Sequence, residues 1–346
     1  MKLRSISVYG LFGEYDYELQ LSDGPLTYVH SQNGFGKSTI MKIVFGLFSG
    51  DLEEVAGTLF DRVDIGFSDN TVLIAENRNS GLLVQMQRNE VEEEITVDDL
   101  KNVIGMTYLS PDRLTTVTDG CMVPSLGIYV EEMMSLVRGA KGDSALVKVP
   151  KKNRKECSDA ELEFWCKDLK AKLEFIKQAG FEPDMPQGFR FPPTRYEIMQ
   201  HREEYLQLAS SLEEYVLRRY ALAESVIVFM DIVNGIFLNK TVFINESGLL
   251  SVRMDSGAPL TISKLSSGEK QILVIFYRLL FQTAPGSLVI IDEPEMSLHI
   301  SWQQQIGQYF KDVAKLRDLQ MIVATHSPQI IHEDWESAAE LKAKDV

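Results

Sequence analysis

A glycine-rich segment near the N-terminus has the residues that a bound phosphate group requires. It reads Ser31-Gln-Asn-Gly-Phe-Gly-Lys-Ser-Thr39 and lies between the apolar run Leu26–Val29 and a helical pattern over Ser38–Phe48. Phosphate binding uses inward-facing backbone N–H groups, a lysine for the terminal phosphates and a hydroxyl for Mg²⁺. The expected nucleotide contacts are Asn33, Gly34, Phe35, Gly36, Lys37, Ser38 and Thr39.

The first position of this loop departs from the usual pattern. Ser31 stands where such loops begin with glycine, so a strict pattern search would miss the segment. Lys37 is the expected cation for the phosphates, and Ser38 is the expected protein ligand of Mg²⁺. A glycine-rich strand-to-helix turn without a ligand is the alternative that this segment alone leaves open.

Two carboxylates end an apolar run in the last third of the chain. Leu288-Val-Ile-Ile-Asp-Glu-Pro294 has the pattern of a buried strand followed by Asp292 and Glu293. An acid at the carboxyl end of a parallel strand lies beside a phosphate loop and can hold Mg²⁺ through water, the role expected of Asp292. Glu293 would then point beyond the terminal phosphate, where a general base for water belongs.

Two further segments complete the set. Leu265-Ser-Ser-Gly-Glu-Lys-Gln271 precedes a helical pattern, and a helix N-terminus with small residues suits an anion. His326 follows an apolar strand pattern, which would place its imidazole near the terminal phosphate. Each segment alone also fits a helix cap or a structural histidine, but their joint occurrence favours one nucleotide site. The expected contacts from the first segment are Ser266, Ser267, Gly268 and Glu269.

Alternating and helical patterns predict the elements that position these residues. The first third has the period-2 alternation of an antiparallel meander. The last third alternates strands and helices, an order that favours a parallel sheet and an α/β fold class. The expected strands are Lys2–Val8, Tyr15–Leu21, Leu26–Val29, Thr58–Phe67, Thr71–Glu76, Leu82–Gln87, the hairpin Thr241–Met254, Leu288–Ile291 and Met321–Ala324, and the expected helices are Ser38–Phe48, Ser267–Phe281 and Ile300–Leu316.

The middle of the chain changes to long helical patterns. Ser158 is placed to cap a helix that continues to Ala179, and a proline-rich connector over Phe181–Thr194 leads to a second helix over Arg195–Asn234. Two antiparallel helices joined in this way form an arm. The expected domains are therefore a head, residues 1–118 and 236–346, and a helical insertion, residues 119–235.

Composition excludes several classes of protein. The 346 residues carry 35 lysines and arginines against 50 aspartates and glutamates, a formal net charge of -15. No uninterrupted apolar stretch is long enough to span a membrane, and no signal peptide is visible. The three cysteines, Cys121, Cys157 and Cys166, lack the spacing of a disulfide framework or a structural zinc site. We therefore expect a cytoplasmic protein without a membrane partner.

One stretch of this acidic chain is strongly basic. Between Arg138 and Lys155, seven basic residues oppose Asp143 alone, a local charge of +6. A patch of this kind can bind DNA even on an acidic protein. The alternatives are a solvated loop and a docking site for an acidic partner protein.

The four segments together resemble those of ABC-type ATPases of the SMC, RecF and OLD group, and of OLD-like AAA ATPases in particular. Glu293-Pro-Glu-Met-Ser-Leu-His299 is similar to the extended Walker B and D-loop of that group, and Ala324-Thr-His-Ser-Pro-Gln-Ile-Ile331 to its switch-histidine segment. The resemblance covers Met1 to about Arg113 and Lys240 to Trp335. It implies a P-loop NTPase head of ABC type, with a mixed sheet, an antiparallel β subdomain and an inserted helical arm.

The resemblance also implies a reaction and an assembly. ATP and Mg²⁺ would bind in a homodimer, with Lys37 of one subunit and Ser267-Gly268 of the other on the same nucleotide. Glu293 and His326 would be the catalytic residues of a slow ATPase. Where such heads have a glutamine loop, this chain has Tyr108-Leu-Ser-Pro-Asp-Arg113, similar to the arginine-ended segment of OLD-like heads. Arg113 would sense the phosphates or pair across the dimer.

The implied function is an ATP-driven switch that controls a separate effector protein, a nuclease or a toxin, in phage defence or DNA repair. OLD-like proteins often carry a nuclease domain, but only 20 residues follow His326 here, so we expect any cleavage to come from another protein. Two alternatives remain. One is an ATP-bound scaffold with little hydrolysis, and the other is a transporter ATPase subunit, which fits the long helical insertion poorly.

Overall fold

Two compact units make up the chain. The computed structural model describes residues 1–32, 34–78, 81–88, 91–118, 121–245 and 247–344. The first unit, here called the head, combines Met1–Ser125 with Ser266–Val346, and the second, here called the insertion, is Leu126–Leu265. The expected boundary near residue 236 therefore moves to residue 265, because the strands that follow the long helix belong to the insertion.

A parallel sheet forms the centre of the head. Its five strands lie in the order β16-β3-β15-β14-β8, and the pairs between its neighbouring strands are all parallel. The carboxyl ends of parallel strands meet at one edge of a sheet, so the segments that follow β3, β8, β14 and β15 lie together there. The strands are β3 (Leu26–His30), β8 (Met106–Leu109), β14 (Leu288–Asp292), β15 (Gln320–Thr325) and β16 (Ala338–Glu340).

An antiparallel sheet forms the second layer of the head. Its seven strands lie in the order β17-β2-β1-β4-β5-β6-β7, which confirms the expected meander. Their alternation buries one face, as in β4, where every second residue is buried. The strands are β1 (Leu3–Leu11), β2 (Tyr15–Gln20), β4 (Arg62–Phe67), β5 (Val72–Arg78), β6 (Gly81–Arg88), β7 (Val91–Glu94) and β17 (Ala343–Lys344), and a separate hairpin pairs β9 (Thr115–Thr118) with β10 (Cys121–Pro124).

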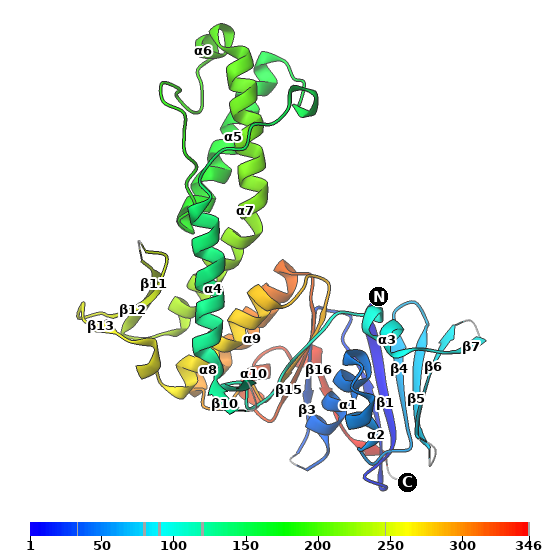
Figure 1. The fold of residues 1–346 in the computed structure, drawn as a ribbon. Coiled ribbons are helices and arrows are strands. Elements are labelled where there is room, and N and C mark those ends of the chain that lie inside the picture. Colours follow the sequence, from blue (N-terminus) through cyan, green and yellow to red (C-terminus); the bar gives the residue numbers. More distant parts are fainter. Residues whose placement is uncertain (33, 79–80, 89–90, 119–120, 246, 345–346) are drawn as a thin grey trace. The chain divides into compact units, whose positions relative to one another are not determined.

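Helix α1 (Lys37–Ser49) joins the two layers, as Figure 1 shows. Its buried residues Ile40, Val44 and Leu47 belong to one apolar core that includes Val63 of β4 and Ile290 of β14. Each fully buried aliphatic side chain of this kind contributes about 1.5–3 kcal/mol. The N-terminus of α1 is thereby fixed beside the ends of β3 and β14.

The described residues of the head contain five further helices, of which two were expected from the sequence and three were not. The expected ones are α8 (Ser267–Tyr277) and α9 (Ile300–Leu316), and the others are α2 (Leu52–Ala56), α3 (Val97–Val103) and α10 (Pro328–Ile331). A short 3₁₀ turn lies at Trp335–Ser337, whereas the turn at Ile262–Lys264 belongs to the insertion. The helix expected over 267–281 ends at Tyr277 and continues as a π-helical turn over Arg278–Gln282. The α/β class with a helical insertion is therefore confirmed.

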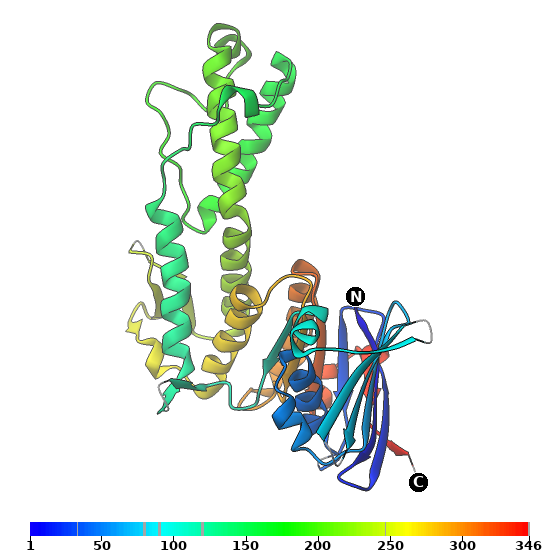
Figure 2. The ribbon, with the colours of Figure 1, turned by 45° about the vertical axis from the view of Figure 1, so that its right-hand side comes forward.

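The insertion contains long helices and one small sheet. In Figure 2, α5 and α7 run side by side along it. Ser158 caps α5 in a reciprocal pair of hydrogen bonds with Glu161, as expected. The second helix is interrupted at His201, and α4 was not expected from the sequence. The helices are α4 (Ser125–Gly142), α5 (Asp159–Gln178), α6 (Arg195–Gln200) and α7 (Arg202–Ile236), with a 3₁₀ turn at Lys151–Asn153.

The sheet of the insertion explains the shifted boundary. Its strands are β11 (Lys240–Ile244), β12 (Leu250–Met254) and β13 (Pro259–Leu260). The side chain of Asn234 in α7 accepts a hydrogen bond from the Val242 N–H at 2.8 Å and donates one to its carbonyl at 2.9 Å. These bonds tie the hairpin to the end of α7.

Candidate nucleotide site

Two glycines shape the loop between β3 and α1. Gly34 and Gly36 have φ angles of 87° and 79°, in the left-handed region that favours glycine. A Cβ on Gly36 would also lie 2.8 Å from a methyl carbon of Leu11. Ser31 is not among the residues with positive φ, so glycine is not required at this first position. Asn33, an expected contact, lies outside the described residues.

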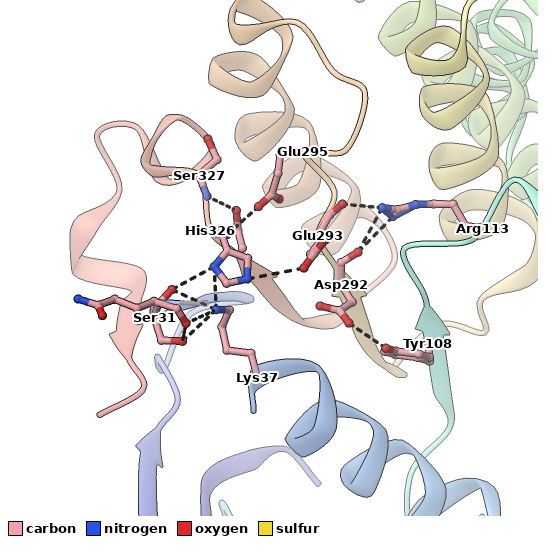
Figure 3. Close-up of polar contacts among 11 residues, drawn as sticks. Ser31, Lys37, Tyr108, Arg113, Asp292, Glu293, Glu295, His326 and Ser327 are labelled. Carbon is pink, nitrogen blue, oxygen red and sulfur yellow. Dashed lines mark hydrogen bonds and ion pairs between the residues drawn. The ribbon is translucent and has the colours of Figure 1, made fainter. Parts of the chain in front are cut away.

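Lys37 begins α1 and its ammonium group is held by the loop itself. Nζ donates to the carbonyl of Ser31 at 3.1 Å, to its hydroxyl at 2.9 Å, and lies 3.0 Å from Nδ1 of His326 (Figure 3). Burial lowers the pKa of Lys37, while the carboxylates of Glu293, Asp292 and Glu295 oppose that shift. The loop thus directs one charged amine toward the carboxylates at the end of β14.

Asp292 ends the fully buried strand β14 and is itself buried. Its Oδ2 accepts a hydrogen bond from the Tyr108 hydroxyl at 3.0 Å, and burial, with Asp292 beside it, raises the pKa of that hydroxyl. Its Oδ1 is buried and has no hydrogen-bond partner among the described residues. A buried unpaired carboxylate oxygen near the start of α1 fits a hydrated Mg²⁺ shared with the Ser38 hydroxyl.

Glu293 and His326 face each other across the end of the sheet. Oε1 of Glu293 lies 3.6 Å from Nε2 of His326 (Figure 3), and Glu293 has a φ of 46°, rare for a residue with a side chain. Its N–H donates to the carbonyl of Ala324 at 2.8 Å. The carboxylate of Glu295 accepts a hydrogen bond from the backbone N–H of His326 at 2.6 Å and so helps to hold the backbone that carries the imidazole.

These groups line one pocket of about 550 Å³. It contains most of the expected residues of the loop, together with Glu293 and His326. Two lining residues, Phe12 and Glu295, were not expected from the sequence. The spacing Glu293-Pro-Glu295 was a signal for Glu295, whereas Phe12, in the turn between β1 and β2, carries no local motif. The lining residues are Phe12, Gly34, Phe35, Gly36, Lys37, Ser38, Thr39, Glu293, Glu295 and His326.

Arg113 does not line this pocket. It is buried, and its Nε donates to Oε1 of Gln271 at 2.8 Å. Its terminal nitrogens donate to the carbonyl of Asp292 at 3.3 and 3.1 Å and to that of Glu293 at 2.7 Å (Figure 3). Burial lowers the pKa of Arg113 to about 10, and Asp292 opposes that shift. In this chain the guanidinium of Arg113 therefore bonds inside the head and not at the pocket, and its expected role, sensing the phosphates or pairing across the dimer, stays a prediction.

The segment Ser266–Glu269 lies at the start of α8 and outside this pocket. Ser266 and Glu269 cap the helix reciprocally, with the Ser266 N–H donating to the Glu269 carboxylate at 2.8 Å. Ser267 is exposed. Gly268 packs so closely on the segment before α9 that an added Cβ would lie 2.4 Å from the carbonyl oxygen of Ser297. Within one chain, this segment and the P-loop do not form one pocket.

Much of the basic stretch is paired inside the insertion. Arg138 lies in α4 and forms an ion pair with Glu131 at 3.3 Å. Lys151 and Arg154 both pair with Glu203 at 3.7 Å. Lys155 lies over the ring of Trp165, 5.4 Å from its centroid. In the described part of the chain, Lys148 and Lys152 are exposed and form no ion pair, so the charge available to a polyanion is smaller than +6.

Two kinds of feature are absent from the described residues. Histidines, cysteines and carboxylates do not gather there in a group of three or more that could hold a metal ion. Among the same residues, no helix is both long and apolar enough to cross a membrane.

A family model described as "AAA domain, putative AbiEii toxin, Type IV TA system" matches residues 175–332. This span contains Ser266–Glu269, Asp292, Glu293 and His326. It begins after the P-loop in the sequence, so the loop itself is assigned from its own residues and geometry.

Two curated relatives match shorter parts of the chain. The probable ATPase of retron Ec83 from Escherichia coli is 39% identical over 84 residues, which cover 21% of this chain and 15% of the relative. The probable ATPase of retron Vc95 from Vibrio cholerae serotype O1 biovar El Tor is 27% identical over 130 residues, 34% of this chain and 24% of the relative. The chain therefore matches less than a quarter of the length of either relative.

Solved structures of SMC head domains are also similar. The head domain from Thermotoga maritima has a TM-score of 0.47 at 13% identity and covers 100% of both chains. The Smc head domain with an extended coiled coil from Pyrococcus furiosus, bound to the C-terminal domain of ScpA, has a TM-score of 0.46 at 12% identity. The match covers 99% of this chain and 96% of that chain. At these scores the fold assignment rests on the chain's own sheets and their order.

Proposed function

Since this chain carries an ABC-type ATPase domain of the AAA class, we propose that it binds ATP with Mg²⁺, hydrolyses the ATP slowly and acts as a nucleotide-driven switch. One observation carries this proposal. The P-loop lysine Lys37, the carboxylate of Glu293 and the imidazole of His326 converge on one pocket of about 550 Å³. The second support is the buried, unpaired oxygen of Asp292, the residue directly before Glu293 in the chain.

The residues divide into those that bind and those that act on water. Backbone N–H groups at the start of α1 are free of helical partners and would receive the phosphates, with Lys37 on the terminal ones. Ser38 and Asp292 would hold Mg²⁺, which neutralises phosphate charge when bound. Glu293 would take the proton from the attacking water, and His326 would orient the terminal phosphate.

Closure by a second copy is the next part of the proposal. Ser267 and Gly268 lie outside the P-loop pocket of their own chain, so a phosphate contact from them requires another molecule. The exposed Ser267 at the N-terminus of α8 offers N–H groups and a hydroxyl to an anion. Two heads would therefore enclose two ATP molecules, with α8 of each head covering the nucleotide of the other.

We place this switch in phage defence, in the cytoplasm, where it would control a separate effector such as a nuclease or a toxin. The retron relatives, named probable ATPases, support the defence setting over DNA repair. A bound DNA would use the free charges of the basic stretch, Lys148 and Lys152 first.

Release of phosphate from ATP by the purified chain tests the proposal. The rate is compared with that of Lys37→Ala, in the presence and absence of duplex or single-stranded DNA. Turnover that requires Lys37 supports an ATPase switch. ATP binding without turnover under every condition would instead support the scaffold alternative, and absence of ATP binding would reject both.

A further inference from the structure

Arg113 connects two functional segments of the head that are far apart in sequence. Its guanidinium donates to Gln271 of α8 on one side. On the other side it donates to the carbonyls of Asp292 and Glu293 (Figure 3). Arg113 is 3% exposed and Gln271 is 4% exposed, so this bridge lies in the interior. Helix α8 is thereby joined to the backbone of Glu293, the residue whose carboxylate is expected to activate water.

The chemistry of this bridge is unusual for a buried arginine. The hydrogen bonds that its guanidinium makes among the described residues go to neutral acceptors, one amide oxygen and two backbone carbonyls. A buried charge is costly unless its hydrogen bonds are satisfied. The planar fork of arginine presents five N–H donors in a fixed geometry, so it can hold acceptors on two separate segments at once. The arrangement therefore depends on α8 and the end of β14 keeping one relative position.

A second set of contacts runs parallel to the first. Arg278, in the π-helical turn after α8, donates to the carbonyl of Tyr108 at 3.1 Å. The hydroxyl of Tyr108 donates in turn to the carboxylate of Asp292. The hydroxyl of Ser125 fixes the backbone of Arg113 through a bond to its carbonyl at 2.7 Å. Tyr108 of β8 and Arg113 after it thus connect α8 and its π-helical turn to Asp292 and Glu293.

We propose that Arg113 is a positioning residue that transmits the position of α8 to Glu293. This inference rests on the proposed function, in which the N-terminus of α8 receives the nucleotide of a second head. A shift of α8 would move Gln271, and through Arg113 the carbonyls of Asp292 and Glu293. The φ angle of Glu293 lies in the left-handed region, which is unfavourable for a residue with a side chain. The direction of its side chain therefore depends on the contacts that hold the backbone at residues 292 and 293. Closure and hydrolysis would be coupled through one buried cation.

Gln271→Met tests the bridge with little change in volume, because it removes only the acceptor on the α8 side. Lys270→Met is the matched control, a change on the same helix at a residue without a contact to Arg113. Amide hydrogen exchange of the nucleotide-free proteins is followed over residues 292–299. We expect Gln271→Met to raise exchange there by about tenfold, within the range of measured couplings, and Lys270→Met to leave it unchanged. Exchange over 292–299 equal to the parental value in Gln271→Met overturns the proposal.

Turnover gives the second readout. In Gln271→Met, kcat should fall by about tenfold while the Kd for ATP at the P-loop stays at the parental value. Arg113→Lys should reduce kcat similarly, and the double variant should be no slower than either single one, because both changes break the same bridge. A parallel loss of ATP affinity, or additive effects, would mean a general structural role and would contradict the proposal. If the parental protein does not hydrolyse ATP, the proposed function fails. The exchange experiment still decides whether Arg113 transmits the position of α8 to Glu293.

Discussion

The ammonium group of Lys37 lies 3.0 Å from Nδ1 of His326, so the P-loop and the segment after β15 contact each other directly. The same Nδ1 lies 3.1 Å from the carbonyl of Ser31, and the other ring nitrogen faces Glu293. A terminal phosphate would enter between the amine and the imidazole and replace their mutual contact. The two residues proposed to contact the terminal phosphate are therefore already close together.

Replacement of Lys37 tests the phosphate assignment. Lys37→Ala removes a charge-assisted contact worth about 1.5–3 kcal/mol, so ATP affinity should fall about 10- to 100-fold. Lys42→Ala, at an exposed position of the same helix, is the control and should bind ATP normally. Titration calorimetry gives the dissociation constants. Equal affinity of Lys37→Ala and the parental protein would contradict the site.

The first loop position should tolerate a change to glycine. Lys37 uses the backbone carbonyl of Ser31 as well as its hydroxyl, and Ser31 lacks a positive φ. We expect Ser31→Gly to keep ATP affinity within about threefold, less than 1 kcal/mol. Gly36→Ala should weaken it strongly, because its φ of 79° and the nearby Leu11 both oppose a Cβ. A large loss in Ser31→Gly, measured by the same calorimetry, would show that the hydroxyl is essential.

The close approach of α8 to the segment before α9 requires glycine at 268. Gly268→Ala would bring a Cβ to 2.4 Å from the Ser297 carbonyl and should cost about 1–3 kcal/mol of stability. At Gly139 in α4 an added Cβ would have no atom within 4 Å, so Gly139→Ala should leave the stability of the protein unchanged or slightly higher. Scanning calorimetry of the full chain compares the unfolding temperatures. Equal transitions for the two variants would mean that the contact at Gly268 is looser than described.

Charge pairing within the insertion predicts opposite effects of two changes on DNA binding. Lys152→Gln removes a free positive charge, whereas Glu203→Gln releases Lys151 and Arg154 from their shared partner. If the basic stretch binds DNA, the first should weaken and the second should strengthen a low-salt mobility shift of ATP-loaded protein. Affinity should also fall with salt at a log–log slope of about 0.9 per phosphate contacted. No shift for the parental protein and for Glu203→Gln would leave the stretch as a solvated or protein-docking segment.

Local chemistry explains how much of the head was predictable. The P-loop, Asp292, Glu293 and His326 stand at the ends of apolar strand patterns, and a parallel sheet brings such ends together whatever the rest of the chain does. The capping pair Ser158 and Glu161 is equally local. These predictions depended on residues a few positions apart.

The features that the sequence did not predict depend on partners far along the chain. Arg113 meets Gln271 from 158 residues away, and nothing near Arg113 in the sequence distinguishes an interior bridge from a phosphate contact. The alternation of residues 241–254 predicted a hairpin but not the unit to which it belongs. The hairpin is held in the insertion by hydrogen bonds between the Asn234 side chain and the backbone of Val242. Helix α4 has apolar residues on one face together with three glycines, which weakened its helical pattern.

In the proposed mechanism, Glu293 activates water in an ATP site closed by a second head. Glu293→Gln keeps the shape of the side chain but removes the base, so single-turnover hydrolysis should slow by about 10²–10⁴-fold. Light scattering should show that the same variant forms an ATP-dependent dimer. The double variant with Ser267→Arg should be a monomer. The single-turnover rate of Glu293→Gln with bound ATP is the most direct measurement. A rate far below the parental rate supports Glu293 as the base that activates water, and a rate equal to the parental rate contradicts that role.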